Sequence, residues 1–170
     1  KKFWVKKETN NDEFQKKCLS FYRSKTLKRL DILKSQDHQI FKVKKINGNA
    51  VRDLFELLNI IDWDDLKNGI PVRFHGDFHF ENILFDQKTK FTFIDWRENF
   101  EGLLNCGDIY YDFAKLLHGL IVSHKQVTHN RYGVKFDNNA AYFDLNRPKI
   151  LFECETIFVE WLIQNSYSKK

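Results

Sequence analysis

The segment HGDFHFENILFDQKTKFTFID, residues 75–95, constrains the fold of this chain more than any other stretch. It contains two short apolar runs, residues 82–85 and 91–94, which are separated by the polar connection DQKTK. Two such runs joined by a short polar connection are typical of a β-hairpin. Folding the chain about this connection places Phe85 opposite Phe91. We therefore expect a short hairpin at the centre of the sequence.

The predicted hairpin also brings two possible metal ligands together. The same register places Asn82 opposite Ile94, so the next residue, Asp95, lies beside Asn82. An amide oxygen and a carboxylate are hard ligands of the kind that Mg²⁺ takes while it keeps water and substrate phosphate in its other positions. Asp77 stands on the loop that leads into the first strand. Its carboxylate could accept the proton of an attacking hydroxyl.

Most of the remaining chain has apolar residues at helical spacing. Helices are expected over residues 11–34 (one or two helices), from Asn49 to about Ile61, from Asp108 to about Ser123, and from Pro148 to about Gln164. An extended segment is expected over residues 39–45 before a turn at Asn47-Gly48, and irregular structure over residues 124–147. The predicted fold class is therefore mainly α with a short β-hairpin (α+β), in one domain over residues 1–170.

Composition limits the classes of protein that remain. The chain is 42% hydrophobic and 30% charged, as in globular proteins, and its apolar runs are too short to cross a bilayer. Cys18, Cys106 and Cys154 lie far apart and form neither a CxxC pair nor an even set, which favours a reducing cytoplasm. The net charge of +5 is spread over the chain and does not by itself identify a partner.

The spacing of these polar residues resembles that of a known family. A His-x-Asp loop, an asparagine five residues after the aspartate and a metal-binding aspartate after a hairpin form the phosphoryl-transfer pattern of protein kinases. Within that pattern, HGDFHFEN, FIDW and GDIYYDFAK resemble the catalytic half of the aminoglycoside phosphotransferase and choline kinase family. The stretch IDWRENFEGLLNCGDIYYDFAKLLHGL is most similar to phosphotransferases of bacterial capsule and surface-polysaccharide loci.

The resemblance implies a reaction, its cofactors and the roles of individual residues. It implies transfer of a phosphoryl group from ATP, or another nucleoside triphosphate, with Mg²⁺ to a hydroxyl of a small molecule such as choline, an aminoglycoside or a sugar. The implied roles are catalytic base for Asp77, support of the catalytic loop for His75, Mg²⁺ ligands for Asn82 and Asp95, nucleotide contacts for Leu84 and Ile94, and structural support for Asp108 and Asp112. The carboxylate of Asp108 could also attract a cationic acceptor. Trp96 and Arg97 follow the metal-binding aspartate and could contact the acceptor, although a packed indole and a surface arginine are the favoured interpretation.

One departure from the family concerns the nucleotide clamp. The seven glycines are isolated, and no Gly-rich phosphate loop is followed by a strand lysine. The chain is therefore expected to be the α-rich C-terminal lobe of a kinase-like fold, with its catalytic loop and metal-site hairpin at residues 73–97. The N-terminal lobe is expected upstream in a longer parent chain, and turnover by this lobe alone is expected to be weak.

Three other interpretations of the sequence are possible. His75, Asp77 and His79 could hold a transition metal for a hydrolase, but this leaves Asn82 and Asp95 unexplained. A kinase-like module could bind a nucleotide or a protein without catalysis. The lysine-rich stretches with neighbouring aromatic residues could bind nucleic acid, but a solvated basic face is the favoured interpretation of them.

Overall fold

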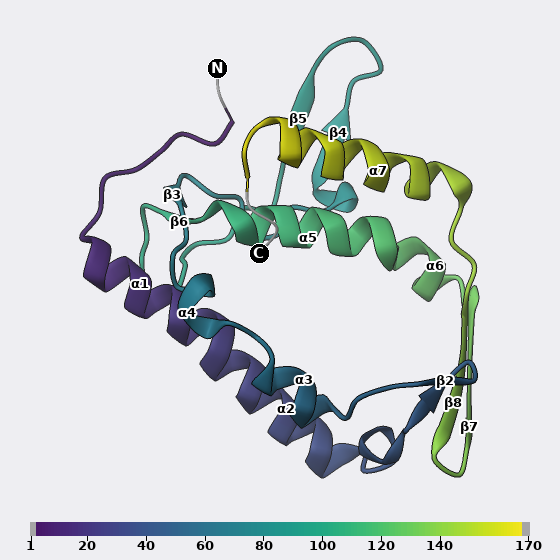
Figure 1. The fold of residues 1–170 in the computed structure, drawn as a ribbon. Helices are drawn as coiled ribbons and strands as arrows, with labels where there is room; N and C mark the ends of the chain where they lie inside the picture. Colours follow the sequence, from purple (N-terminus) through teal and green to yellow (C-terminus); the bar gives the residue numbers. More distant parts are fainter. Residues whose placement is uncertain (1–2, 168–170) are drawn as a thin grey trace.

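The computed structural model describes residues 3–167, and its helices and strands are arranged as Figure 1 shows. The α-helices are α1 (Asn11–Leu19), α2 (Lys25–Gln36), α3 (Leu54–Asn59), α4 (Trp63–Leu66), α5 (Ile109–Ile121), α6 (His124–Thr128) and α7 (Lys149–Gln164). Shorter helical turns are the π-helical η1 (Ser20–Ser24) and the 3₁₀ turns η2 (Ile40–Lys42) and η3 (Phe80–Asn82). The predicted mixture of helices with small sheets is confirmed.

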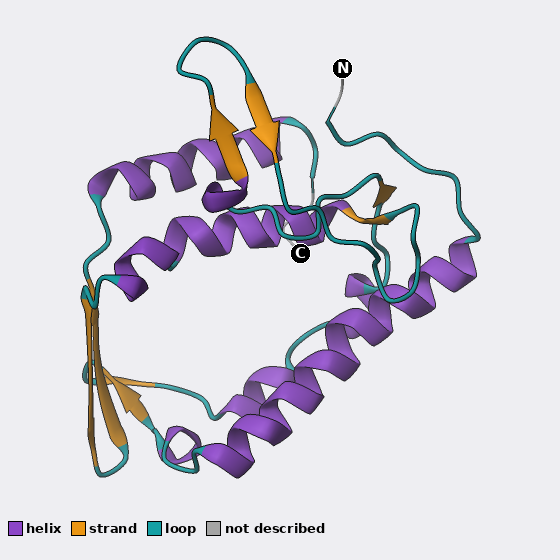
Figure 2. Cartoon of the chain, turned by 180° about the vertical axis from the view of Figure 1, so that it is seen from behind, coloured by secondary structure: helices purple, strands orange, loops and turns teal. Residues whose placement is uncertain are grey.

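The strands form three small sheets, which Figure 2 shows from behind. The strands are β1 (Lys45–Ile46), β2 (Asn49–Ala50), β3 (Pro71–Val72), β4 (Ile83–Phe85), β5 (Phe91–Phe93), β6 (Gly107–Asp108), β7 (Tyr132–Asp137) and β8 (Ala140–Leu145). They assemble as β2-β1-β8-β7, β3-β6 and β4-β5. The β4–β5 pair is the predicted hairpin.

The main core lies where α1 and η1 meet the β3–β6 pair and α5. Phe14 and Cys18 are one turn apart on α1 and are fully buried. The π turn that follows lets the consecutive residues Phe21 and Tyr22 both face inward, because it holds more residues per turn than an α-helix. The Phe21 ring stacks on Phe100 with 4.4 Å between their centroids. The predicted helical segment over residues 11–34 therefore forms one continuous helix that contains a π turn between α1 and α2.

Residues 39–61 differ from the prediction in two places. The expected extended segment contains the 3₁₀ turn η2, although the turn at Asn47-Gly48 is confirmed between β1 and β2. Asn49 was expected to cap a helix, but it lies in β2 opposite Ile46. Asp53 caps α3 instead, because its carboxylate accepts from the Glu56 amide at 2.8 Å and the Glu56 carboxylate accepts from the Asp53 amide.

Residues 124–147 are not irregular, and this prediction was wrong. They form helix α6 and the hairpin β7–β8, in which Val134 lies opposite Phe143 and Phe136 opposite Ala141. The turn needs a left-handed residue, which Asn138 supplies with φ 52°. The alternation of apolar and polar residues along β7 was the signal for a strand that the sequence offered.

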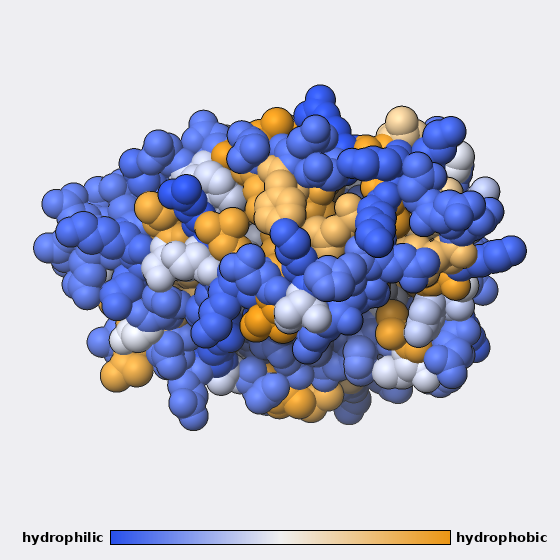
Figure 3. Space-filling model, turned by 90° about the horizontal axis from the view of Figure 1, so that it is seen from below, coloured by the Kyte–Doolittle hydropathy of each residue, from blue (hydrophilic) through white to orange (hydrophobic). Residues whose placement is uncertain are grey.

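Helices α5 and α7 lie side by side, and Phe113 of α5 contacts the rings of Phe158 and Trp161 of α7. Both helices begin and end close to their predicted bounds. The residues of α7 predicted to face inward are only partly covered, and no residue of this helix is buried. Apolar side chains are also exposed elsewhere, and the face seen from below in Figure 3 shows them between polar ones.

The N-terminal segment runs alongside β3, where Lys6 forms an isolated antiparallel bridge with Val72. The Lys7 amide donates to the Pro71 carbonyl at 2.9 Å, and the Arg73 amide donates to the Val5 carbonyl at 2.8 Å. Phe3 and Trp4 pack against Phe78, Phe93, Trp96, Phe113 and Trp161. Both rings are thus part-buried in packing contacts, and Lys1 and Lys2 lie outside the described residues.

Among residues 3–167, no helix combines the length and the apolar character that crossing a bilayer requires.

Candidate active site

The central hairpin forms with the predicted register. Phe85 lies opposite Phe91, and the Ile94 amide donates to the Asn82 carbonyl at 3.0 Å, which sets Asp95 beside Asn82. Asn82 itself ends the 3₁₀ turn η3 rather than lying within the strand. The sequence therefore predicted the pairing correctly and placed the strand start one residue early.

Asp95 has an unusual backbone conformation. Its φ is 58°, in the left-handed region that disfavours residues with a side chain and costs about 1 kcal/mol or more. Its side chain is exposed, and no residue of the described chain offers its carboxylate a hydrogen bond or an ion pair. A residue that keeps a strained backbone conformation, and whose carboxylate has no partner among residues 3–167, suggests a ligand that is not part of the chain.

Gly76 allows the catalytic loop to pass close to the hairpin exit. Its φ is 80°, and a Cβ there would overlap the Arg97 Cβ and approach the Phe74 ring at 2.8 Å. The Arg97 amide donates to the His75 carbonyl at 2.8 Å across this narrow gap. The close approach explains why this loop carries glycine where protein kinases have arginine.

Asp112 of α5 binds the backbone of the same loop. Its carboxylate accepts from the His75 amide at 2.8 Å, the Gly76 amide at 2.7 Å and the Trp4 indole at 2.9 Å. Burial raises the pKa of Asp112, while these three N–H donors oppose the rise. Asp112 therefore makes the contacts expected of a residue that supports the catalytic loop.

His75 is fully buried beneath the loop. Burial lowers its pKa, although nearby Asp112, the Ile94 carbonyl, Asp77 and Asp95 oppose this shift. A neutral imidazole fits the contact in which the Asp77 amide donates to Nδ1 at 3.3 Å. His75 is thus placed to hold the backbone of Asp77, as a supporting residue would be.

The Asp77 side chain is part-exposed at the end of this loop. Its carboxylate contacts Lys115 Nζ at 2.7 Å and His79 Nε2 at 3.1 Å. Asn82 Nδ2 donates to the Asp77 carbonyl at 2.9 Å and lies 3.3 Å from Oδ2. Burial alone would raise the pKa of Asp77, but Lys115 and His79 outweigh it, so the pKa lies below its usual range. The Asp77 carboxylate is therefore ionised at neutral pH.

Lys115 is the functional candidate that the sequence reasoning missed. It lies three residues after Asp112 on α5, so both side chains reach the catalytic loop from the same face of the helix. The three-residue spacing between Asp112 and Lys115 was the signal in the sequence that could have identified Lys115. Nothing in the sequence alone, however, fixed how α5 crosses the loop.

Comparison with models of protein families decides the assignment. The model of the family described as "Phosphotransferase enzyme family" matches residues 19–132, which include the catalytic loop, the hairpin and α5. The chain belongs to this family. Comparison with curated proteins and with solved structures gave no significant match.

Within this phosphotransferase, the three-ligand metal cluster proposed for a hydrolase does not form. His75 is enclosed, and His79 Nδ1 contacts the Glu81 carboxylate at 2.8 Å while its Nε2 contacts Asp77. Among the described residues, no group of three or more His, Cys, Asp and Glu side chains is arranged to hold a metal ion. Asp77 and His79 instead form a chain of contacts with Glu81, in the order Glu81–His79–Asp77.

Two of the possible acceptor contacts pack within the phosphotransferase. The Trp96 indole donates to the Phe93 carbonyl at 3.0 Å and lies against the His75 ring, with 4.8 Å between centroids. The Arg97 guanidinium donates to the Tyr111 hydroxyl at 3.2 Å. Trp96 therefore packs as a structural residue, and Arg97 points toward Tyr111 of α5.

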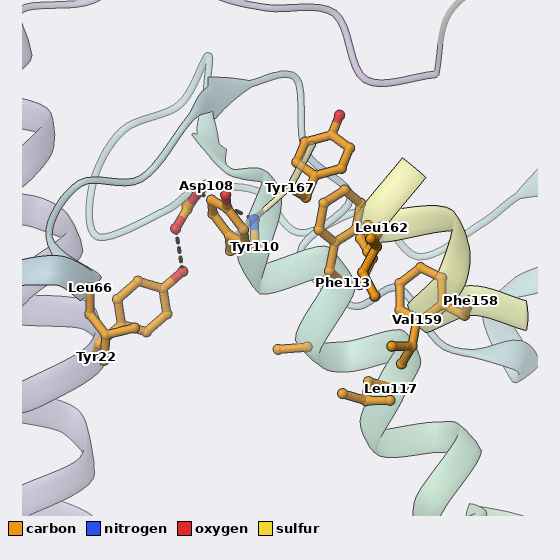
Figure 4. A pocket seen from close by; sticks show the side chains of 12 residues that line it. Tyr22, Leu66, Asp108, Tyr110, Phe113, Leu117, Phe158, Val159, Leu162 and Tyr167 are labelled. Atoms are coloured by element: carbon orange, nitrogen blue, oxygen red, sulfur yellow. Dashed lines mark hydrogen bonds between the residues drawn. The ribbon is translucent and has the colours of Figure 1, made fainter. Parts of the chain in front are cut away.

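Asp108 does not offer its carboxylate to an acceptor. It is 1% exposed and accepts from the Tyr22 hydroxyl at 2.7 Å, the Ile70 amide at 2.9 Å and the Tyr110 amide at 3.3 Å. Figure 4 shows the Tyr22 contact at the edge of a cavity of about 480 Å³. The cavity walls are otherwise mainly apolar side chains of α5 and α7. The role as an acceptor contact is not supported, whereas the helix-capping role is consistent with this geometry.

Leu84 and Ile94 share one face of the hairpin, because alternate residues of paired strands point to the same side. Their exposed fractions of 51% and 40% leave both side chains accessible to a ligand. Their contact with a nucleotide stays a prediction.

Proposed function

We propose that this phosphotransferase transfers the γ-phosphoryl group of MgATP, or of another nucleoside triphosphate, to a hydroxyl of a small molecule. The observation that carries the proposal is the hairpin, whose register sets Asp95 beside Asn82, while the Asn82 side chain contacts the Asp77 carboxylate. The Asp95 carboxylate has no hydrogen-bond or ion-pair partner among residues 3–167. A biosynthetic role in surface polysaccharide and a cytoplasmic location, which the sequence resemblance implies, are part of the same proposal.

Asn82 and Asp95 fit a magnesium ion in their chemistry. Asn82 Nδ2 donates to the Asp77 carbonyl, which leaves its Oδ1 without a donor among the described residues. An amide oxygen and a free carboxylate are hard ligands, and Mg²⁺ usually takes only one or two carboxylates from a protein. When bound, the ion would neutralise phosphate charge and orient the transferred group.

Asp77 would orient the acceptor hydroxyl and receive its proton. Phosphoryl transfer passes through a loose transition state, so accurate positioning contributes more than strong basicity. An ionised carboxylate with a lowered pKa suits this role. Lys115 would hold that carboxylate in one orientation through its 2.7 Å contact with Oδ1.

Replacement of Lys115 should change the pH dependence of turnover. The change Lys115→Met removes the cation that lowers the pKa of Asp77 and leaves the burial that raises it. Because the ionised form of Asp77 is the active one, the acidic limb of kcat/KM against pH should move to higher pH. Lys88→Met, in the exposed hairpin loop, is the control. An identical acidic limb in wild type and Lys115→Met would contradict this role.

Thermal melting with and without MgATP tests the nucleotide site directly. A ligand that binds only the native state raises the melting temperature, and a hundredfold excess over Kd adds about 2.7 kcal/mol. We expect a rise with MgATP that is much smaller with ATP in excess EDTA. A rise without phosphoryl transfer to any acceptor would favour the non-catalytic binding module, and no rise would refute the nucleotide site.

A further inference from the structure

A second cavity opens beside Asp77, on a different face of α5 from the cavity in Figure 4. It has a volume of about 540 Å³, within the range for small-molecule sites. Its lining includes His79 and Lys115, the two side chains that contact the Asp77 carboxylate. A hydroxyl group of a molecule in this cavity would therefore lie near the proposed base.

The charged groups around the cavity are mostly cationic or imidazole. Lys115 and Lys125 line it together with three histidines, and Glu81 is the single acid in the lining. Glu81 already contacts His79 Nδ1 at 2.8 Å and His124 Nδ1 at 3.9 Å. Lys115 is paired with Asp77 at 2.7 Å, so Lys125 is the cation of the lining that has no ion-pair partner among the described residues, and a cationic acceptor would lie near its ammonium group.

Two polar side chains of the lining are available to a ligand. The Lys125 ammonium and the His118 imidazole make no hydrogen bond or ion pair with other parts of the described chain. Lys125 is exposed on α6 and His118 is exposed on the last turn of α5. Together they can donate to an anionic group, and hydrogen bonds to an ionised acceptor are stronger than neutral ones.

The remaining walls are apolar and suit the face of a ring. Phe80, which is 43% exposed, lies on the loop side, and Val122, Val127 and Leu151 add further apolar side chains to the lining. A site with apolar walls and a few convergent polar groups is the usual form of a small-molecule pocket. The other cavity offers no such combination, because its acid, Asp108, is 1% exposed and bonded within the protein.

We infer that this cavity is the acceptor site and that it takes a small, hydroxyl-bearing ring molecule with a negative charge, such as a sugar acid. The inference rests on the proposed function and narrows its acceptor class, since it favours an anion over choline or an aminoglycoside. Lys125 and His118 would bind the anionic group while a ring hydroxyl points toward Asp77.

Three sugars with one ring and different charges test the inference. Glucuronate, glucose and glucosamine are titrated separately into the chain, and Kd is measured by saturation-transfer NMR, with and without MgATP. Glucuronate should bind about tenfold more tightly than glucose, because one charge-assisted hydrogen bond is expected to increase the affinity by about that factor. Glucosamine should bind most weakly. Lys125→Ala should reduce the affinity for glucuronate to that for glucose. Lys135→Ala, at an exposed position of β7, is the matched control and should leave all three Kd values unchanged.

The possible failures can be told apart. Tighter binding of glucosamine, binding of none of the sugars, or a glucuronate preference that survives both Lys125→Ala and His118→Ala would overturn the anionic site. An unchanged circular dichroism spectrum shows that a variant is folded. A missing MgATP effect on the melting temperature counts against the proposed function instead, because that measurement contains no sugar.

Discussion

In the longer parent chain that the sequence predicts, Asp95→Ala should reduce phosphoryl transfer from MgATP by at least about a thousandfold, because it removes the charged ligand proposed to hold the metal ion against the phosphates. The same change should leave the unligated melting temperature equal to or slightly above that of wild type. Asp95 is exposed, has no partner among residues 3–167 and occupies a strained φ of 58°. The measurements are transfer of labelled γ-phosphate and thermal melting of the same samples.

The matched control for Asp95 is Glu98→Ala. Glu98 is an exposed carboxylate three residues further along the chain, so its removal changes the net charge equally but leaves the proposed metal site intact. Asp77→Asn separates the two roles, since it should lose turnover and keep the MgATP-dependent rise in melting temperature. Full activity of Asp95→Ala would refute the metal site, and loss of fold in that variant would assign Asp95 a structural role.

Asp112→Ala should have the largest effect on stability. The change leaves the His75 and Gly76 amides and the Trp4 indole without their acceptor, in a place where the carboxylate is 0% exposed. Each buried unpaired donor costs about 1–3 kcal/mol, so the free energy of unfolding should fall by about 3 kcal/mol or more. Urea unfolding followed by circular dichroism measures this change.

A graded series makes the test of Asp112 specific. Trp4→Phe removes one of the three donors and keeps an aromatic ring, so it should cost about 1 kcal/mol. Asp12→Ala removes an exposed carboxylate from the first turn of α1 and should change stability by less than about 0.5 kcal/mol. A loss for Asp112→Ala no greater than that for Trp4→Phe would show that Asp112 does not hold the loop amides.

The candidate site could be predicted from the sequence because its parts are local. The hairpin register follows from the length of one polar connection, and that register alone brought Asp95 beside Asn82. The same holds for α5, whose start at Asp108 is encoded by a capping residue followed by an apolar stripe. Where a short stretch of chain determines the geometry, the pattern of residue types was sufficient to predict the structure.

The predictions failed where distant segments decide the structure. The sheet β2-β1-β8-β7 joins residues about 95 positions apart, and Asn47 contributes to it through contacts with Phe143. The hairpin β7–β8 is local and was missed although β7 alternates between apolar and polar residues, whereas the two-residue strands β1 and β2 carry little signal of their own and depend on pairing with the distant β8. Lys115 was missed for the same reason, because its contact with Asp77 depends on how α5 crosses the loop. The N-cap of α3 was predicted at Asn49 instead of Asp53, because both residue types cap helices equally well and Asn49 comes first in the segment.

The packing of the N-terminal segment has a practical consequence for work on this protein. The indole of Trp4 reaches the carboxylate that holds the catalytic loop, and Phe3 contacts both that loop, at Phe78, and the hairpin, at Phe93 and Trp96. Trimming these first residues, or attaching a bulky tag against them, would disturb the proposed active site from a point more than seventy positions away in the chain. An affinity tag on this chain is therefore better attached through a flexible spacer that leaves Phe3 and Trp4 free to pack.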